Sequence, residues 1–502
     1  MTSNARRPLP IPMDAPPVSR HIADLAGLGL RPADVAAYAR SPQSSGIDVS
    51  LEGYDGEALS AVREARANLD AARLGGAVYG LTTGVGALRH VSLEDERDDP
   101  VGHALRLWRS HAGGLGPEID DGVARGTMLV RLFQLLRGGS GVDFELVRAL
   151  AAALDAGAVP RLHLYGGIGT GDLTALAELG LTLVGELPWR SGTAVHVPVT
   201  EGDALPLISS NALTAAVGSI AITGLAGLAR TAEQVAALSH LALRGSLQAY
   251  DPRVHAAKED PQTAAVAARL LALLAGPTRA SARLQDPFGL RSLPQVHAAW
   301  EEALAATERA LSAEIGAAAE NPLAVNGTVL HHGQFVTQRL AAGLDAVRAT
   351  AVPALSLSAA RLGALLDPTL TGLPAFLAVG PRGSCGLMIV EYVAADLLGR
   401  IRITAAPVTS ARTVVSLGLE EHASHSTQAA WACHDLLGMV PELLACELVA
   451  AVRTLRLDPE RVADCPARAV FERVDAALPD VRPDHVLGPE LEAAADLVRS
   501  GL

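Results

Sequence analysis

A glycine-rich stretch, Tyr165–Glu186, holds the residues with the clearest potential for chemistry. It opens with Gly166, Gly167, Gly169 and Gly171 and continues as an amphipathic run with apolar residues at helical spacing. Such a loop either caps a buried helix or cradles a phosphate. A phosphate cradle is disfavoured, because the stretch has no Gly-Lys-Ser/Thr and no strand–loop–helix pattern of dinucleotide type.

Two polar residues stand where the helix after these glycines would begin. Asp172 and Thr174 are of the types that accept hydrogen bonds from the first backbone N–H groups of a helix. We therefore expect their side chains to cap the helix that the amphipathic run predicts.

A second glycine-rich loop, at residues 78–86, contains Tyr79. Its glycines, Gly80, Gly84 and Gly86, exclude a stable helix. A tyrosine in such a loop either packs against the core or serves as a mobile catalytic group. Because a phenol titrates near about 10, Tyr79 needs a positive or hydrogen-bonded setting to act as a base near neutrality.

The elements that must position these loops are predicted to be helices. Ala and Leu dominate the 502 residues and aromatic residues make up only 3%, which favours a mainly α protein. We expect a flexible arm at residues 1–20, and a loop-rich helical part at 21–200 that carries Tyr79 and Gly169-Thr170-Gly171. A helical-bundle core with C-terminal helices is expected at 201–502.

The charge and composition of the chain indicate which kinds of partner it can bind and in which compartment it is expected. The formal charge of −13 argues against nucleic acid as the main partner. The N-terminal residues lack the apolar segment of a secretory signal, and the four cysteines show no metal spacing, so we expect a cytoplasmic protein without a metal. Ala212–Ala229 is uncharged over a length near the lower limit for a membrane span, but its small and hydroxyl residues favour a core helix over a membrane partner.

The stretch at 165–186 resembles the prosthetic-group segment of the histidine/phenylalanine/tyrosine ammonia-lyase family. In that family an inner Ala-Ser-Gly cyclises into an electrophilic 4-methylidene-imidazol-5-one (MIO) ring. Here the inner three residues are Gly169, Thr170 and Gly171. Gly169 can replace the alanine, whose side chain is only a methyl, and dehydration of Thr170 would give an ethylidene whose extra methyl crowds the electrophilic carbon.

Further motifs in family order, roughly over residues 55–460, carry the same resemblance. It implies a long helical bundle, a homotetramer with active sites shared between subunits, and an amino-acid-like substrate. It implies that Tyr79 takes the β-proton, and that Ser110-His111 contacts the substrate side chain. For the remaining matches it implies a bidentate pairing of Arg291 with the substrate carboxylate, a contact of Glu420 with the amino group or a basic side chain, and packing of Phe335 near the ring.

Three positions depart from the family pattern. The supporting asparagine falls on Ser209, and Asn211, two positions later, can substitute only if the backbone shifts. A tyrosine becomes Phe288, so a hydroxyl is missing, and a glutamine becomes Glu391. Together with Thr170 these changes leave the reaction open, because function belongs to the site rather than to the fold.

Three hypotheses remain open at this point. The first is an ammonia-lyase or aminomutase with a threonine-derived ring, acting on histidine or another aromatic amino acid. The second is an enzyme without the ring that uses Tyr79, Arg291 and Glu420 for a different elimination, addition or cyclisation in specialised metabolism. The third is a non-catalytic relative. The charged and polar residues predict a histidine-like rather than a phenylalanine-like substrate.

Overall fold

The computed structural model describes residues 19–93, 100–277, 280–462 and 464–502. The arm predicted at residues 1–20 lies almost wholly in 1–18, outside the described residues. The described chain is mainly helical, as the composition predicts. Its strands are short and form two-stranded sheets only.

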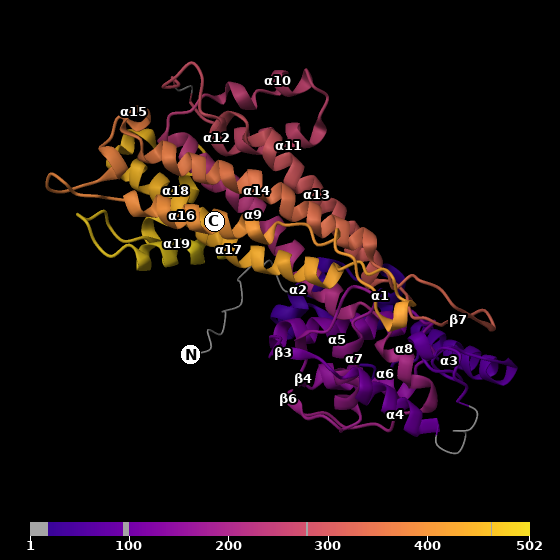
Figure 1. The fold of residues 1–502 in the computed structure, drawn as a ribbon. Helices are drawn as coiled ribbons and strands as arrows, with labels where there is room; N and C mark the ends of the chain where they lie inside the picture. The colour runs from indigo at the N-terminus through magenta and orange to yellow at the C-terminus, as the bar shows by residue number, and fades with distance from the viewer. Residues whose placement is uncertain (1–18, 94–99, 278–279, 463) are drawn as a thin grey trace.

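The described part of the chain up to Ile208 forms most of the lower body in Figure 1. Its sheets pair β1 with β2 in parallel, and β3 with β5 and β4 with β6 antiparallel. The helices of this body are α1 (Ile22–Leu28), α2 (Pro32–Arg40), α3 (Glu57–Gly75), α4 (Pro100–His111), α5 (Asp121–Leu136), α6 (Phe144–Asp155), α7 (Leu173–Leu183) and α8 (Ala204–Ile208). The strands are β1 (Arg20–His21), β2 (Ile47–Asp48), β3 (Leu115–Glu118), β4 (Val159–Pro160), β5 (His163–Tyr165) and β6 (Trp189–Ser191).

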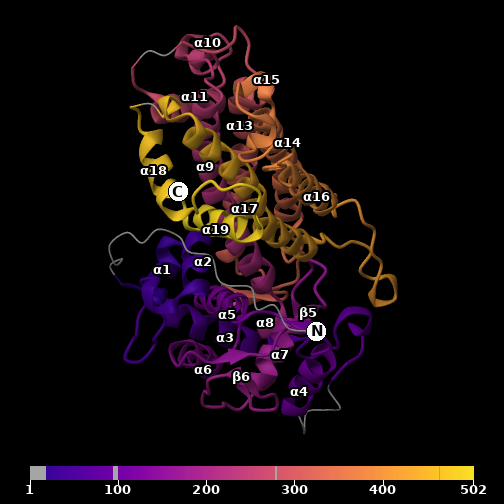
Figure 2. The same cartoon turned by 90° about the vertical axis from the view of Figure 1, so that its left-hand side faces the viewer.

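Long helices form the second body, which extends away from the first in both views (Figures 1 and 2). They are α9 (Ala212–Ala242), α13 (Leu293–Ile315), α14 (Gln338–Leu366), α16 (Met388–Thr404) and α17 (Ser426–Leu457). The shorter elements are α10 (Pro252–Ala256), α11 (Pro261–Leu274), α12 (Phe288–Arg291), α15 (Pro368–Thr371), α18 (Ala467–Ala477) and α19 (Gly488–Ser500). The antiparallel pair β7 (Leu323–Val325) and β8 (Thr328–Leu330) packs against α3 of the lower body instead. The domain division predicted at residue 200 stays a prediction.

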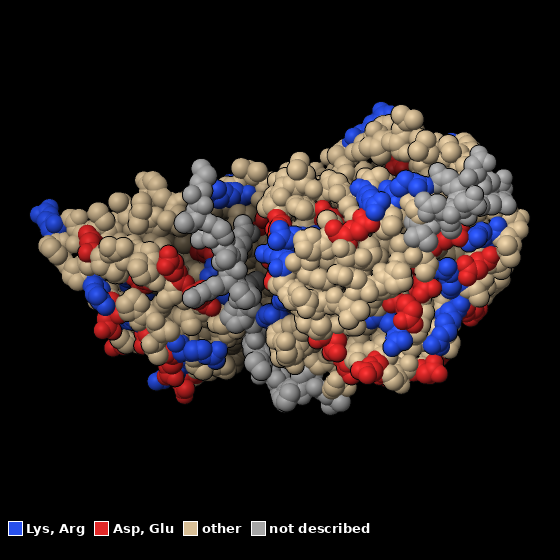
Figure 3. Space-filling model, turned by 90° about the horizontal axis from the view of Figure 1, so that it is seen from below, with Lys and Arg blue, Asp and Glu red and all other residues tan. Residues whose placement is uncertain are grey.

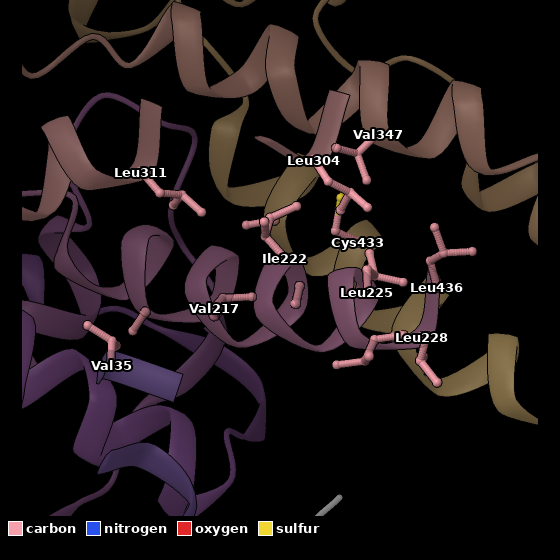
Figure 4. Packing of buried hydrophobic residues seen from close by; sticks show 14 of the residues in the cluster. Val35, Val217, Ile222, Leu225, Leu228, Leu304, Leu311, Val347, Cys433 and Leu436 are labelled. Atoms are coloured by element: carbon pink, nitrogen blue, oxygen red, sulfur yellow. The ribbon is translucent and has the colours of Figure 1, made fainter. Parts of the chain in front are cut away.

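Helix α9 lies at the centre of the core. Its apolar side chains point toward α13, α14 and α17, so that Ile222 and Leu225 lie close to Leu304, Val347 and Cys433 (Figure 4). Most of α9 is buried. Burial of apolar surface at about 25 cal/mol per Å² makes this packing the main stabilising term of the bundle.

Two helical segments, Glu201–Ala242 and Gln338–Leu366, are long and apolar enough to cross a membrane by length and composition. Other elements bury 72% of the first apolar window and 50% of the second. The stretch 212–229 accordingly lies in α9 as a core helix. Basic and acidic side chains are interspersed on the face shown in Figure 3, as expected for charge that is spread along the chain.

Candidate active site

The loop that joins β5 to α7 carries Gly169, Thr170 and Gly171, and it rests on the N-terminal ends of two long helices. The backbone N–H of Asp172 donates to the carbonyl of Ser210, just before α9, at 2.6 Å. The N–H of His425, at the start of α17, donates to the carbonyl of Ile168 at 2.9 Å. The loop is therefore fixed on both sides where helix N-termini bring positive partial charge.

The Asp172 carboxylate caps a different helix from the one predicted. Helix α7 has no side-chain cap from Asp172 or Thr174. Instead, Asp172 accepts hydrogen bonds from the N–H and the hydroxyl of Thr214, both at 2.8 Å, in the first turn of α9. The prediction for α7 was wrong because tertiary packing offers this carboxylate a better-placed helix N-terminus. Burial raises the pKa of Asp172 to about 6, against the lowering effect of these bonds.

An open cleft of about 220 Å³ lies beside Thr170. Its walls also include Phe335, which precedes α14, and Glu420, which precedes α17. The remaining lining residues are Leu419, Glu421 and His422. The structure therefore brings Thr170, Phe335 and Glu420 together from three distant parts of the sequence.

Tyr79 is not among the residues that line this cleft, but its loop contacts the segment that carries Glu420. Its hydroxyl oxygen accepts a hydrogen bond from the Gly86 N–H at 2.6 Å, and the same loop is tied to the 415–420 segment by Ala87 N–H, which donates to Ser416 Oγ at 2.9 Å. Burial, followed by the neighbouring charge of Glu420, raises the pKa of Tyr79 above its ordinary value, although the Gly86 bond acts in the opposite direction. Tyr79 in the single chain is therefore a protonated phenol near neutrality.

Asn211 contacts the central loop directly. Its Oδ1 accepts the N–H of Gly171 at 3.1 Å, while its Nδ2 donates to the Phe335 carbonyl at 2.8 Å. Ser209 lies nearby, but its hydroxyl accepts the N–H of Asn321 at 3.1 Å instead. The asparagine side chain thus reaches Gly171 from two positions beyond the one that sequence register indicates.

Several predicted site residues lie away from the cleft within one chain. Phe288 begins and Arg291 ends α12, which packs against α13 and α14 and lies far from α7 and α8 in Figure 1. Phe288 is 62% exposed, and the Arg291 guanidinium stacks over its ring at 4.4 Å. Glu391 stands in the first turn of α16.

Ser110 and His111 end α4, and both side chains contact the carbonyl of Leu107, at 2.9 and 2.8 Å. Neither side chain is among those that line the cleft. The contact with a substrate side chain implied for them stays a prediction.

Sequence reasoning missed a cluster of buried hydroxyl groups behind the loop. Ser424 donates to the carbonyl of Gly169 at 2.6 Å, and Thr337 and Ser426 complete the cluster. Ser424 ends the stretch 419–424, in which Glu420 resembles the family pattern, and this resemblance was the only signal for Ser424 in the sequence. Thr337 and Ser426 gave no signal, because their proximity arises only from the fold.

Comparison with known proteins identifies the family of this chain. The model of the family described as aromatic amino acid lyase matches residues 30–476. The chain belongs to the aromatic amino acid lyase family. A histidine ammonia-lyase from Geobacillus thermodenitrificans is 32% identical over 461 residues, covering 87% of this chain and 90% of the relative. One from Streptomyces avermitilis is 33% identical over 509 residues, covering 96% and 97%.

Solved structures of the family share the fold. Histidine ammonia-lyase from Trypanosoma cruzi superposes with a TM-score of 0.82 at 26% identity, covering 94% of this chain and 92% of that chain. Tyrosine aminomutase from Streptomyces globisporus reaches 0.86 at 24% identity, covering 96% and 97%. Ergothionase from Treponema denticola reaches 0.85 at 22% identity, covering 95% and 98%. The last two likenesses show the fold alone.

Aromatic amino acid lyases typically form the MIO ring. Ring closure needs a backbone nitrogen, a carbonyl two residues earlier and a β-hydroxyl between them. Gly171 supplies the nitrogen, Gly169 the carbonyl and Thr170 the hydroxyl, and all three are held beside the cleft. The residues present therefore fit the group.

Proposed function

We propose that this chain is a carbon–nitrogen lyase that eliminates ammonia from a histidine-like amino acid in the cleft at Thr170. The convergence of Thr170, Glu420 and Phe335 on one cleft carries the proposal, because it places an electrophile precursor beside a carboxylate. Tyr79 belongs to a loop that is hydrogen-bonded to the segment carrying Glu420, and the charge of Glu420 acts on its phenol. The relatives at 32–33% identity named histidine ammonia-lyase support the reaction class.

The ring from Gly169, Thr170 and Gly171 would supply an electrophilic carbon for the substrate. Every other step falls to side chains. Phe335 offers an apolar wall near Thr170, and Glu420 offers a carboxylate that can hold an ammonium group.

The substrate class follows from the cleft's polarity. Glu420, Glu421 and His422 line it together, which gives it acidic and hydrogen-bonding character. A phenyl side chain that covered these groups would leave them unpaired, at a cost of about 1–3 kcal/mol each. An imidazole, an amide or a second amine would satisfy them, so we expect a polar or basic side chain on the substrate.

In this proposal Tyr79 is the base that removes the β-proton of the substrate. Its raised pKa means that a base role requires added positive charge beside the phenol. Arg291 from another copy, with the substrate ammonium, would provide that charge. The proposal thus links the base role of Tyr79 to assembly.

Assembly as a homotetramer is part of the proposal, since Arg291 and Glu391 do not line the cleft of their own chain. Helix α16 also exposes apolar side chains that a further copy would cover: Ile389, Tyr392, Val393 and Ile403. Exposed apolar surface of this kind marks an interaction site. Light scattering should give the mass of four chains, and a stable monomer would contradict this part. We place the enzyme in the cytoplasm.

A second candidate is an enzyme of the same fold that works without the ring. It is favoured by one observation: the Tyr79 phenol lies within electrostatic range of Glu420, which lines the cleft, and neither group needs the ring to transfer a proton. They would catalyse another elimination, addition or cyclisation in specialised metabolism. The aminomutase reaction is a variant of the first candidate, and it would yield a β-amino acid instead of free ammonia.

The experiment is ammonia release from a panel of L-histidine, L-phenylalanine, L-tyrosine and polar analogues. We expect kcat/KM for L-histidine or a polar analogue to exceed that for L-phenylalanine. Glu420→Gln serves as the matched variant, because it keeps the shape of the side chain and removes its charge. Faster turnover of phenylalanine than of every polar substrate would contradict the proposed substrate class.

A further inference from the structure

The two peptide groups that flank Thr170 are each hydrogen-bonded to a buried side chain. On one side, the Gly169 carbonyl accepts the Ser424 hydroxyl at 2.6 Å. On the other, the Gly171 N–H donates to Asn211 Oδ1 at 3.1 Å. Ser424 and Asn211 are 0% and 4% exposed, so water does not compete for either contact.

The hydroxyl hydrogen of Ser424 is directed at the Gly169 carbonyl. The carbonyl contact is shorter than the contacts of Ser424 Oγ with Ser426 Oγ, at 3.2 Å, and with Thr337 Oγ1, at 3.3 Å. The backbone N–H of Ser426 donates to Ser424 Oγ at 3.3 Å and so occupies its acceptor side. These contacts leave the carbonyl as the acceptor for the single hydrogen of Ser424.

The amide nitrogen of Asn211 fixes the orientation of its side chain. Its Nδ2 donates to the Phe335 carbonyl at 2.8 Å, and because a carbonyl needs a donor, this contact fixes which end of the amide faces the loop. Oδ1 must then face the Gly171 N–H. The contact draws the amide hydrogen away from the nitrogen and fixes the orientation of that peptide group.

We infer that Ser424 and Asn211 promote closure of the Gly169-Thr170-Gly171 ring, an inference that rests on the proposed function. The Gly171 nitrogen attacks the Gly169 carbonyl carbon, and the developing negative charge on the oxygen is stabilised by the Ser424 hydroxyl. Asn211 positions the attacking nitrogen. Both side chains are positioning residues, since neither enters the ring.

The bonds and protons of the closure balance as two losses of water. A bond forms between the Gly171 nitrogen and the Gly169 carbonyl carbon, and the Gly171 amide proton ends on the former carbonyl oxygen. That oxygen leaves as water with the Thr170 amide proton, which gives a carbon–nitrogen double bond. The second water takes the Thr170 hydroxyl and its Cα hydrogen. No oxidant or other reactant is needed.

The test is the intact mass of the purified, full-length chain. We compare the natural sequence with Ser424→Ala, Asn211→Leu and the control Ser219→Ala, which also removes a fully buried hydroxyl, one bonded to the Ala215 carbonyl inside α9. The natural chain and the control should lack two waters. Loss of one oxyanion donor slows a reaction by about 10²–10³-fold, so Ser424→Ala should accumulate unclosed chain, and Asn211→Leu likewise.

Two conservative variants separate a specific role from a folding defect. Ser424→Thr keeps the hydroxyl and Asn211→Asp keeps an acceptor oxygen, so both should close more completely than the variants that lack these atoms. Complete closure in Ser424→Ala and Asn211→Leu would overturn the inference and leave the proposed function standing. Equal failure of Ser424→Ala and Ser424→Thr would also overturn it. An unmodified mass for the natural chain would refute the ring itself, and with it the first proposed function.

Discussion

Replacing Gly169 by alanine would restore a residue of the family's triad, yet the structure predicts that it is harmful here. A Cβ built on Gly169 would lie 2.6 Å from Ser426 N and 2.7 Å from Ser426 Oγ, and closer still to Ser424 Oγ. One of these neighbours is backbone and cannot rotate away. Gly169 also has φ +80°, which side-chain-bearing residues rarely adopt.

The loss of folding stability expected for Gly169→Ala has two parts. Overpacking a well-packed site costs about 1–3 kcal/mol, and a left-handed backbone adds about 1–2 kcal/mol for alanine. The control is Gly157→Ala, because Gly157 has φ +68° and nothing within 4 Å of its built Cβ. Gly157→Ala should show only the loss of stability that comes from the left-handed backbone.

Urea unfolding measures both variants, and we expect Gly169→Ala to lower the free energy of unfolding by about 1–3 kcal/mol more than Gly157→Ala does. Displacement of Ser424 should also leave the Gly169→Ala chain with an unclosed mass. Equal stability of the two variants, or a Gly169→Ala chain as stable as the natural one, would refute the packing argument.

Further predictions concern the acid–base groups and the carboxylate anchor. Tyr79→Phe should lower kcat by about 10²–10⁴-fold with little change in substrate binding, as measured by steady-state kinetics. Full activity of this variant would contradict the base role of Tyr79. Arg291→Lys should raise KM about tenfold through loss of the bidentate contact; an unchanged KM would place the carboxylate elsewhere. The pKa of Asp172, about 6 in the folded chain against 3.8 ordinarily, contributes stability at low pH that is lost as pH rises through 6. The free energy of unfolding should therefore fall by roughly 3 kcal/mol between about pH 4 and 7 because of this carboxyl group, and Asp172→Asn should remove that part of the fall. Urea unfolding at several pH values measures it, and an unchanged pH profile would contradict the raised pKa of Asp172.

The sequence sufficed for the helical fold and for part of the site. Ala- and Leu-rich periodicity predicts helices directly. The glycine-rich loop around Thr170 locates a residue of the cleft, and the loop around Tyr79 locates a phenol near the segment that carries Glu420. Glu420 could be predicted as well, because the stretch 419–424 resembles the family pattern. These successes depend on local patterns.

The rest depends on partners that are distant along the chain. Asp172 caps α9 instead of α7 because the helix N-terminus best placed for its carboxylate belongs to another element. Asn211 reaches Gly171 in place of Ser209 for a similar reason, since the turn before α9 directs the later side chain toward the loop. Arg291 lies on α12 and does not line the cleft of its own chain, so the carboxylate-binding role that we propose for it requires contacts between copies.

The dependence of turnover on Thr170 tests the account most directly. Ammonia release from the preferred polar amino acid is measured for the natural chain and for Thr170→Ala, which keeps the flanking glycines and removes the hydroxyl that ring formation requires. The account predicts ready release by the natural chain and loss of turnover in Thr170→Ala, with the substrate still bound. Equal ammonia release by the two proteins would contradict it.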